Sequence, residues 1–342
     1  LKQLDEFPII NKFDINNNFE SILKDSKTKN VSKTGGTSGL VSYFPTGKID
    51  SKINFNRQVF LRQNFNINPN SKCLYIWGHS HKFNDSNLKI ILTTLKIKFK
   101  NYYFNRKQIS AYEFTEKNLE LIVSNILTNK FKYIISYGST LDILIKFIKT
   151  KYHSIDTKIK FITTSETVSD KTIIDKNKVM PNLELINEFG MAETGVIGYN
   201  RKNDFEVISN LWNSFFKKKK KQNKIVITTL DKKVFPLINY DPDDLIETDD
   251  ENSVLNFKIK GKERPIFNIK GQKDNLKISS IVFDHIFKNI NGIFSVQYFY
   301  DEFDEKLFIL YCSNISYKNS TLNKITLEKL KYSYKNIFFI KL

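Results

Sequence analysis

The chain has 342 residues, 40% of them hydrophobic, so it can bury a large core and is expected to form one large domain plus a smaller one. Its 54 Lys and Arg against 36 Asp and Glu give a net charge of +18, but the lysines are spread among Asn and Ile rather than gathered in a stripe, which argues against a nucleic-acid partner. There is no apolar run of membrane-spanning length and no secretory signal pattern, so we expect a cytoplasmic protein, and the first residue, Leu1, suggests a missing N-terminal piece.

Short apolar runs alternate with helix-length segments through the first half of the chain. Strands are expected at 74–77, 133–136 and 161–164, and apolar residues at helical spacing predict helices at 116–127 and 141–148. This order predicts βαβ units. The expected fold class is therefore α/β, with a large, multi-layered N-terminal domain built on mostly parallel sheets.

From Lys224 onward the pattern changes to short strands separated by turns. Runs at 225–230, 235–240 and 254–260 predict a meander or a small β-barrel-like part. Beyond Gly261 a compact α+β unit is expected, with strands and helices at 266–271, 281–288, 294–300, 306–311 and 326–334. We therefore expect a large core domain at 1–260, truncated at its start, and a small C-terminal lid domain at 261–342, truncated at its end.

Six small residues at 34–39, with the sequence TGGTSG, form the most informative motif. Three glycines allow backbone amides to turn toward one point, and the hydroxyls add donors, which predicts a phosphate cradle. The Gly-Lys-Ser/Thr ending of a kinase-type P-loop is missing. A flexible surface turn is the alternative.

Two acidic motifs follow later in the chain. In EFGMAETG, after an expected strand at 183–186, Phe189 and Gly190 suit a turn where a purine lies on the ring, and Glu193 suits a Mg²⁺ ligand. The alternative is a loop into a helix with Glu193 in its first turn. In FPLINYDPDDL, Asp244 is placed to accept both ribose hydroxyls, with an Asp-rich turn as the alternative. The basic turn GKERPIF, from Gly261, is a hinge or a simple linker.

In this order the motifs resemble those of the adenylate-forming (ANL) superfamily. The chain is most similar to its phenylacetate-CoA ligase branch and to relatives near capsular polysaccharide genes. Further segments that resemble this branch are FPIINKFDI at 7–15, SYGS at 136–139 and TTSETV at 163–168. The resemblance covers essentially the whole chain.

The resemblance implies a role for each matching residue. ATP and Mg²⁺ are the implied cofactors, with residues 34–39 on the β- and γ-phosphates, Phe189 beside adenine, Asp244 on the ribose and Glu193 on Mg²⁺. The full set implied at the nucleotide is Thr34, Gly35, Gly36, Thr37, Ser38, Gly39, Ser165, Glu166, Phe189, Gly190 and Asp244. The implied catalytic residues are Thr34, Thr37, Glu193 and Lys262, and the implied acyl-pocket residues are His79 and Tyr137.

The implied function is ATP-dependent adenylation of a small carboxylic acid, followed by transfer of the acyl group to a thiol such as CoA or to an amine, in surface polysaccharide biosynthesis. Such a displacement needs charge neutralisation more than acid or base groups, so the lack of a Ser-His-Asp signature is expected.

Three departures keep a second hypothesis open, namely a catalytically impaired nucleotide- or acyl-binding protein of the same fold. Ala192 stands where the family has Thr or Ser, and Pro265 where it has the hinge aspartate. The family's C-terminal Gly-Lys motif has no match here, and Lys341 is a poor substitute.

Overall fold

The computed structural model describes most of the chain. The described residues are 6–26, 28, 30–33, 42–78, 87–111, 114–128, 130–201, 204–210, 214–219, 224–248, 256–259, 266–270, 275–287, 290, 293–301, 303–313, 315–330, 334 and 336–342. The expected phosphate loop at 34–39, His79 and Lys262 lie outside them.

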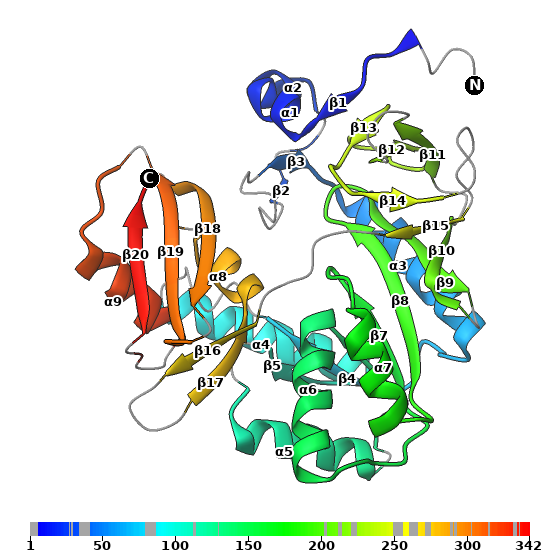
Figure 1. Cartoon of the computed structure of the whole chain (residues 1–342). Coiled ribbons are helices and arrows are strands. Elements are labelled where there is room, and N and C mark those ends of the chain that lie inside the picture. Colours follow the sequence, from blue (N-terminus) through cyan, green and yellow to red (C-terminus); the bar gives the residue numbers. More distant parts are fainter. Residues whose placement is uncertain are drawn as a thin grey trace.

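A nine-stranded mixed sheet forms the centre of the fold, in the order β14-β15-β10-β9-β8-β7-β6-β4-β5 (Figure 1). Five neighbouring strands are parallel, namely β4 (Cys73–Trp77), β5 (Arg106–Ser110), β6 (Tyr133–Ser136), β7 (Lys160–Thr164) and β8 (Glu184–Met191). Four more extend the sheet in antiparallel fashion, namely β9 (Gly195–Arg201), β10 (Asp204–Asn210), β14 (Ile246–Glu247) and β15 (Asn256–Ile259).

Helices connect the parallel strands and confirm the predicted βαβ units. They are α4 (Asn87–Tyr103), α5 (Glu116–Leu127), α6 (Gly138–Lys151) and α7 (Asp170–Val179). The hydroxyl of Thr115 accepts the backbone N–H of Asn118 at 3.3 Å and caps the start of α5. All four residues of β6 are buried, as is typical of a parallel strand covered on both faces.

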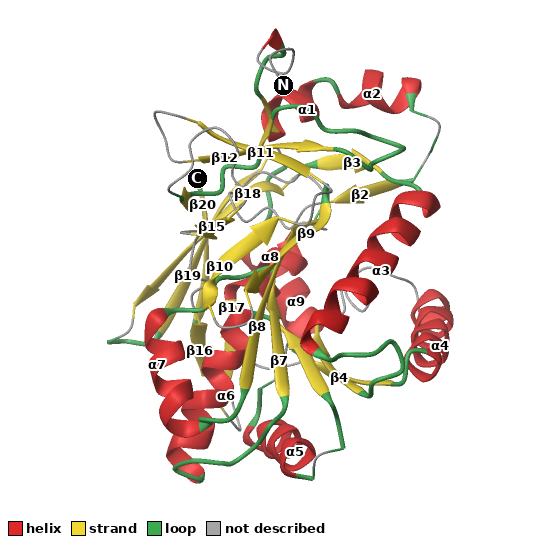
Figure 2. Ribbon diagram, turned by 90° about the vertical axis from the view of Figure 1, so that its right-hand side faces the viewer, coloured by secondary structure: helices red, strands yellow, loops and turns green. Residues whose placement is uncertain are grey.

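Alternate residues of the parallel strands enter two different cores. Ile134 belongs to the large cluster that α5 and α6 cover, whereas Ile135 belongs to a smaller cluster on the opposite face. That second face is covered by α3 (Lys48–Arg62) and the 3₁₀ turn Gln63–Phe65. The sheet is thus the middle of three layers, with α3 on one side and α5 to α7 on the other (Figure 2).

Smaller sheets lie beside the large one. A four-stranded sheet has the order β1-β13-β12-β11, with β1 (Ile10–Asn11), β11 (Ser214–Lys219), β12 (Lys224–Thr229) and β13 (Tyr240–Asp241). The chain after β1 forms α1 (Lys12–Asn17), α2 (Phe19–Asp25), β2 (Val31–Lys33) and β3 (Tyr43–Pro45), of which β2 and β3 pair with each other.

The strands expected to form one barrel-like part are divided between two sheets. Strands β11 to β13 belong to the four-stranded sheet, while β14 and β15 belong to the edge of the nine-stranded one. In the expected strand 235–240, only Tyr240 pairs, within β13. Pro236 has no N–H to donate to a ladder, which explains the late start of that strand.

The C-terminal segment contains the expected α+β elements. They are β16 (Ile266–Lys270), β17 (Asn275–Ser279), α8 (Ser280–Phe287), β18 (Ile293–Asp301), β19 (Lys306–Ser313), α9 (Asn319–Leu330) and β20 (Ile337–Lys341). The helix expected at 326–334 is thus α9, which begins and ends earlier. Leu276 and Ile278 of β17 lie fully buried in the same cluster as Leu141 of α6. The expected boundary at 261–265 lies outside the described residues, and the division into a core and a lid stays a prediction.

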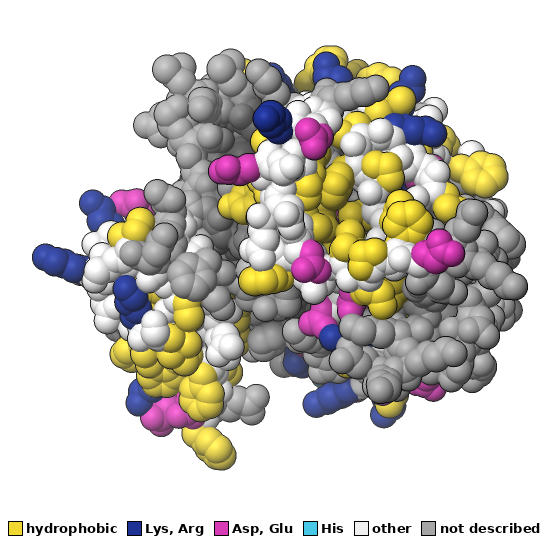
Figure 3. Space-filling model, turned by 90° about the horizontal axis from the view of Figure 1, so that it is seen from above, with side chains coloured by type: hydrophobic (Ala, Val, Ile, Leu, Met, Phe, Trp, Pro, Cys, Tyr) yellow, Lys and Arg dark blue, Asp and Glu magenta, His cyan; other side chains and the backbone are white. Residues whose placement is uncertain are grey.

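The surface charge agrees with a scattered distribution of lysines. On the upper face, Lys and Arg side chains are interspersed with apolar and acidic ones (Figure 3). None of the described helices combines the length and the apolar composition needed to cross a bilayer.

Candidate functional site

Predicted site residues follow the carboxyl ends of three adjacent parallel strands. Tyr137 follows β6, Ser165 follows β7, and the turn that carries Glu193 follows β8. Because these strands pair in parallel, their carboxyl ends meet at one edge of the sheet. In open α/β sheets, ligands bind at that edge.

The turn between β8 and β9 buries a carboxylate. Glu193 is only 4% exposed, and the hydroxyl of Tyr240 in β13 donates a hydrogen bond to its Oε1 at 2.8 Å. Burial and the charge of Glu193 raise the pKa of Tyr240, so the phenol stays protonated and acts as the donor. The alternative in which Glu193 starts a helix is wrong, because the turn joins two antiparallel strands.

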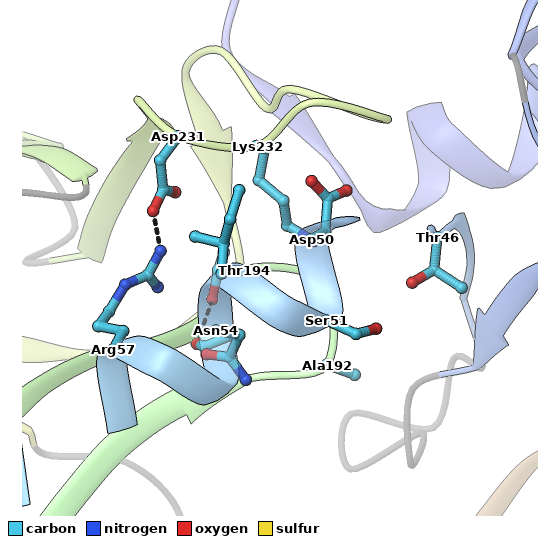
Figure 4. A pocket seen from close by; sticks show the side chains of 11 residues that line it. Thr46, Asp50, Ser51, Asn54, Arg57, Ala192, Thr194, Asp231 and Lys232 are labelled. Atoms are coloured by element: carbon cyan, nitrogen blue, oxygen red, sulfur yellow. Dashed lines mark hydrogen bonds and ion pairs between the residues drawn. The ribbon is translucent and has the colours of Figure 1, made fainter. Parts of the chain in front are cut away.

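Helix α3 holds this turn in place. The Oδ1 of Asn54 accepts the N–H of Val196 at 2.8 Å, and Nη1 of Arg57 donates to the carbonyl oxygen of Val196 at 2.7 Å. Arg57 also forms an ion pair with Asp231, in the loop after β12 (Figure 4). A Cβ on Gly190 would lie 2.7 Å from the carbonyl oxygen of Gly195, so glycine at that position allows β8 and β9 to approach closely.

Gly195 provides a test of this geometry. Its φ is +75°, and a Cβ on it would lie 2.5 Å from Asn54 Oδ1. We expect Gly195→Ala to lower the free energy of unfolding by about 2–4 kcal/mol, from left-handed strain and the displaced Asn54 amide. Urea unfolding followed by circular dichroism measures it. The double variant with Asn54→Ala should cost less than the sum of the single variants, and a cost under about 0.5 kcal/mol for Gly195→Ala would contradict the described turn.

A recess opens beside the turn, between α3 and the loop after β12 (Figure 4). It is lined by Thr46, Asp50, Ser51, Ile53, Asn54, Arg57, Ala192, Thr194, Gly195, Asp231 and Lys232. The Asp50 carboxylate accepts the N–H groups of Lys233 at 2.8 Å and Val234 at 3.3 Å, which ties the loop to α3. Burial lowers the pKa of Lys232, although the charges of Asp50 and Glu193 oppose this shift. The recess thus combines cationic and anionic groups beside the Glu193 turn.

Glu166 lies in the loop between β7 and α7, against the start of α6, with 8% of its surface exposed. Its Oε2 accepts the N–H of Ser139 at 2.8 Å, and its Oε1 accepts the hydroxyl of Ser279 at 3.3 Å. The preceding Ser165 is exposed and has a φ of +67°. The Glu166 carboxylate therefore links α6 to the C-terminal hairpin, and its expected contact with a nucleotide stays a prediction.

The two aromatic residues expected at the ligand, Phe189 and Tyr137, pack against other aromatic side chains. Phe189 is 9% exposed and meets Phe257 edge to face, with ring centroids 5.5 Å apart. Tyr137 is 1% exposed and stacks on Trp77 at 4.4 Å between centroids. Their expected roles beside adenine and the acyl group stay predictions.

Asp244 follows β13, the strand that carries Tyr240. After burial and the charge of Glu193, the charge of Asp244 is a further cause of the raised pKa of Tyr240. The structure thus joins the Glu193 turn after β8 to Tyr240 of β13, and Asp244 lies in the segment after β13. The expected roles of Thr34 to Gly39, His79 and Lys262 concern residues outside the described ones.

A magnesium ion that also binds phosphate oxygens needs few protein ligands. Within the part of the chain that the structure describes, no three His, Cys, Asp or Glu side chains gather into a metal-binding group. Mg²⁺ commonly takes one or two protein carboxylates and completes its coordination with water and phosphate oxygens. A single buried carboxylate such as Glu193 satisfies that requirement.

Sequence reasoning missed a buried ion pair that supports the end of β8. Arg62 Nη2 and Glu188 Oε2 lie 2.7 Å apart, and the Tyr199 hydroxyl donates to the same carboxylate. It also missed Asn54 and Arg57, whose partner Val196 is 142 and 139 residues away in the chain. Local spacing carries no signal for contacts of this kind.

Comparison with known proteins identifies the fold. No family model and no curated protein matches the sequence. A 2-hydroxyisobutyryl-CoA ligase in complex with 2-HIB-AMP and CoA has a TM-score of 0.54 at 13% identity, over 98% of this chain and 76% of that one. A double mutant of o-succinylbenzoate CoA synthetase from Bacillus subtilis, bound to a product analogue, has a TM-score of 0.51 at 11% identity, over 91% of this chain and 64% of that one. The chain therefore has the mixed α/β fold of acyl-CoA ligases.

Proposed function

We propose that the protein activates a carboxylic acid with ATP, forming an acyl-AMP, in the manner of acyl-CoA ligases. The observation that supports this most is the buried Glu193 carboxylate, which lies in the turn at the carboxyl edge of the parallel strands and accepts the Tyr240 hydroxyl at 2.8 Å. The shared fold agrees with it, because the ligand of the 2-hydroxyisobutyryl-CoA ligase is an acyl-AMP. The acid and the acceptor, CoA or an amine, complete the proposed set of partners.

The reaction is a displacement at the α-phosphorus. A carboxylate oxygen of the acid attacks phosphorus, the bond from phosphorus to the bridging oxygen breaks, and pyrophosphate leaves. The acyl group then passes to a thiol or an amine, and AMP leaves. Charge accumulates on phosphate oxygens throughout, so the protein must neutralise and orient it.

Individual residues have distinct parts in this proposal. Glu193 holds Mg²⁺, which supplies positive charge to the phosphates when bound. Tyr240 fixes the Glu193 carboxylate through the 2.8 Å hydrogen bond. Asp244 accepts the ribose hydroxyls, residues 34–39 hold the β- and γ-phosphates, and Lys262 acts from the hinge.

The finer assignment rests on sequence motifs alone. The order of the TGGTSG, EFGMAETG and FPLINYD motifs favours the phenylacetate-CoA ligase branch, with a role in surface polysaccharide assembly. The proposed C-terminal lid domain is 261–342.

A second candidate is a nucleotide- or acyl-binding protein of the same fold without turnover. Ala192 favours it, because this side chain lines the recess beside Glu193 where the family pattern has a hydroxyl. Pro265, at the expected hinge aspartate, would restrict backbone rotation there.

Pyrophosphate exchange separates the two candidates. The protein is incubated with ATP, Mg²⁺, labelled pyrophosphate and each member of a panel of aromatic, fatty and hydroxy acids. We expect at least one acid to drive label into ATP, and EDTA to stop the exchange. ATP binding by calorimetry without exchange for any acid would favour the binding protein, and absence of both would overturn the proposed function.

A further inference from the structure

The second half of α4 presents an apolar stripe to solvent. Leu95, Phe99, Tyr102 and Tyr103 are 56%, 73%, 87% and 73% exposed. Their spacing of i, i+4, i+7 and i+8 places them on one face of the helix. In an ordinary surface helix this face packs on the core, but here Ile97 and Asn101 on the opposite side are the half-buried residues.

Three lysines flank the stripe. At about 100° per residue, Lys98 lies on one side of Leu95 and Phe99, while Lys96 and Lys100 lie on the other. All three side chains are exposed. Among the described residues, none of the three takes part in an ion pair.

The stripe lies at an outer edge of the molecule. Helix α4 packs beside β5, the last strand of the large sheet, next to α3 (Figure 2). At the end of α4, Phe104 contacts Phe55 of α3, with ring centroids 5.2 Å apart, and Phe55 is itself 42% exposed.

We infer that this face of α4 binds the surface of an anionic phospholipid bilayer. The four apolar side chains enter the boundary between headgroups and acyl chains, and Lys96, Lys98 and Lys100 reach lipid phosphates on both sides of the stripe. A helix with Phe and Leu on one face and flanking lysines has the composition of helices that lie in the membrane plane.

Charge favours a bilayer over a protein partner. Protein interfaces are depleted in lysine, whereas lysines border this stripe on both sides. If a second copy of the protein bound through the same face, six ammonium groups would come together. The sequence of α4 contains no Asp or Glu that could offset their charge. An anionic bilayer instead offsets all three charges at once, and the net charge of +18 adds to the attraction.

Vesicle flotation tests the inference, independently of any adenylation. The full chain is mixed with vesicles of phosphatidylcholine alone or with 30% phosphatidylglycerol. We expect binding to the anionic vesicles at about 50 mM salt, at least tenfold weaker binding to neutral ones, and loss of binding as salt rises. Failure to float with anionic vesicles would overturn the inference.

Two variants and two matched controls locate the contact. The triple variants Leu95→Ser/Phe99→Ser/Tyr103→Ser and Lys96→Gln/Lys98→Gln/Lys100→Gln should each weaken vesicle binding at least tenfold, with unchanged thermal unfolding because the side chains are exposed. The controls are Phe303→Ser, at a fully exposed position, and Lys130→Gln/Lys132→Gln/Lys158→Gln, at exposed lysines elsewhere. An equal loss of vesicle binding in the control variants would overturn the inference in favour of non-specific attraction. A concentration-dependent dimer that the α4 variants abolish would overturn it in favour of self-association.

Discussion

Replacing Glu193 with Gln should lower Mg²⁺-dependent pyrophosphate exchange by about 10²–10³-fold, the usual effect of removing one group that stabilises developing charge. The carboxylate charge holds the metal in the proposed function, and an amide oxygen is a much weaker ligand for Mg²⁺. The fold should survive, because Gln has the same shape and its amide oxygen still accepts the Tyr240 hydroxyl. Exchange rates at several Mg²⁺ concentrations measure the loss of activity, and thermal unfolding measures whether the fold survives.

Tyr240→Phe is the matched control for Glu193→Gln. It keeps the Glu193 charge but removes the hydrogen bond to it, which costs about 1.5–3 kcal/mol of stability in a buried site. Exchange should therefore fall less than in Glu193→Gln, while stability falls more. Full exchange activity in Glu193→Gln would show that this carboxylate holds no metal.

The largest stability effect is expected at the Arg62 and Glu188 ion pair. Burial lowers the pKa of Arg62, but Glu188, Tyr199 and Tyr133 together raise it by more, so the guanidinium stays charged with only 15% of its side chain exposed. Arg62→Met leaves the Glu188 charge without its partner, and we expect a loss of about 3–5 kcal/mol in the free energy of unfolding. Urea unfolding measures it.

A double-mutant cycle tests whether the two charges are coupled. Adding Glu188→Gln to Arg62→Met removes the isolated charge, so the double variant should regain about 2 kcal/mol or more relative to additive losses. The exposed pair Lys146 and Asp142 serves as a comparison, and Lys146→Met should change stability by less than about 1 kcal/mol. Additive effects at Arg62 and Glu188 would show that the pair is not coupled as the structure describes.

Regular elements were predicted well wherever hydrophobic periodicity is strong. The helix expected at 116–127 is α5 with the same bounds, and the strands expected at 133–136 and 161–164 are β6 and β7. Burial on one helix face or on both faces of a strand leaves a periodic pattern in the sequence. The strand expected at 235–240 shrank to its last residue, because pairing there depends on partners elsewhere in the chain.

For the candidate site, too, the sequence predicted residues but not their contacts. Motif order predicted roles for Glu193 and Asp244, and the fold shows that Glu193 accepts the hydroxyl of Tyr240. The motifs TTSETV and EFGMAETG also predicted roles for Glu166 and Phe189, and in the structure Glu166 accepts the backbone N–H of Ser139 in α6 while Phe189 lies in a hydrophobic cluster. A motif specifies a residue type at a position, but not which neighbours share its hydrogen bonds or its surface.

By itself, the sequence determined the alternating βαβ order and the α+β elements of the C-terminal segment, since each depends on neighbours within one element or one turn. Only the tertiary structure decided that Asn54 and Arg57 hold the Glu193 turn, that Arg62 neutralises Glu188, and that the aromatic stripe of α4 faces solvent. Those facts depend on segments that are far apart in the chain and meet only when the sheet and its covering helices are assembled.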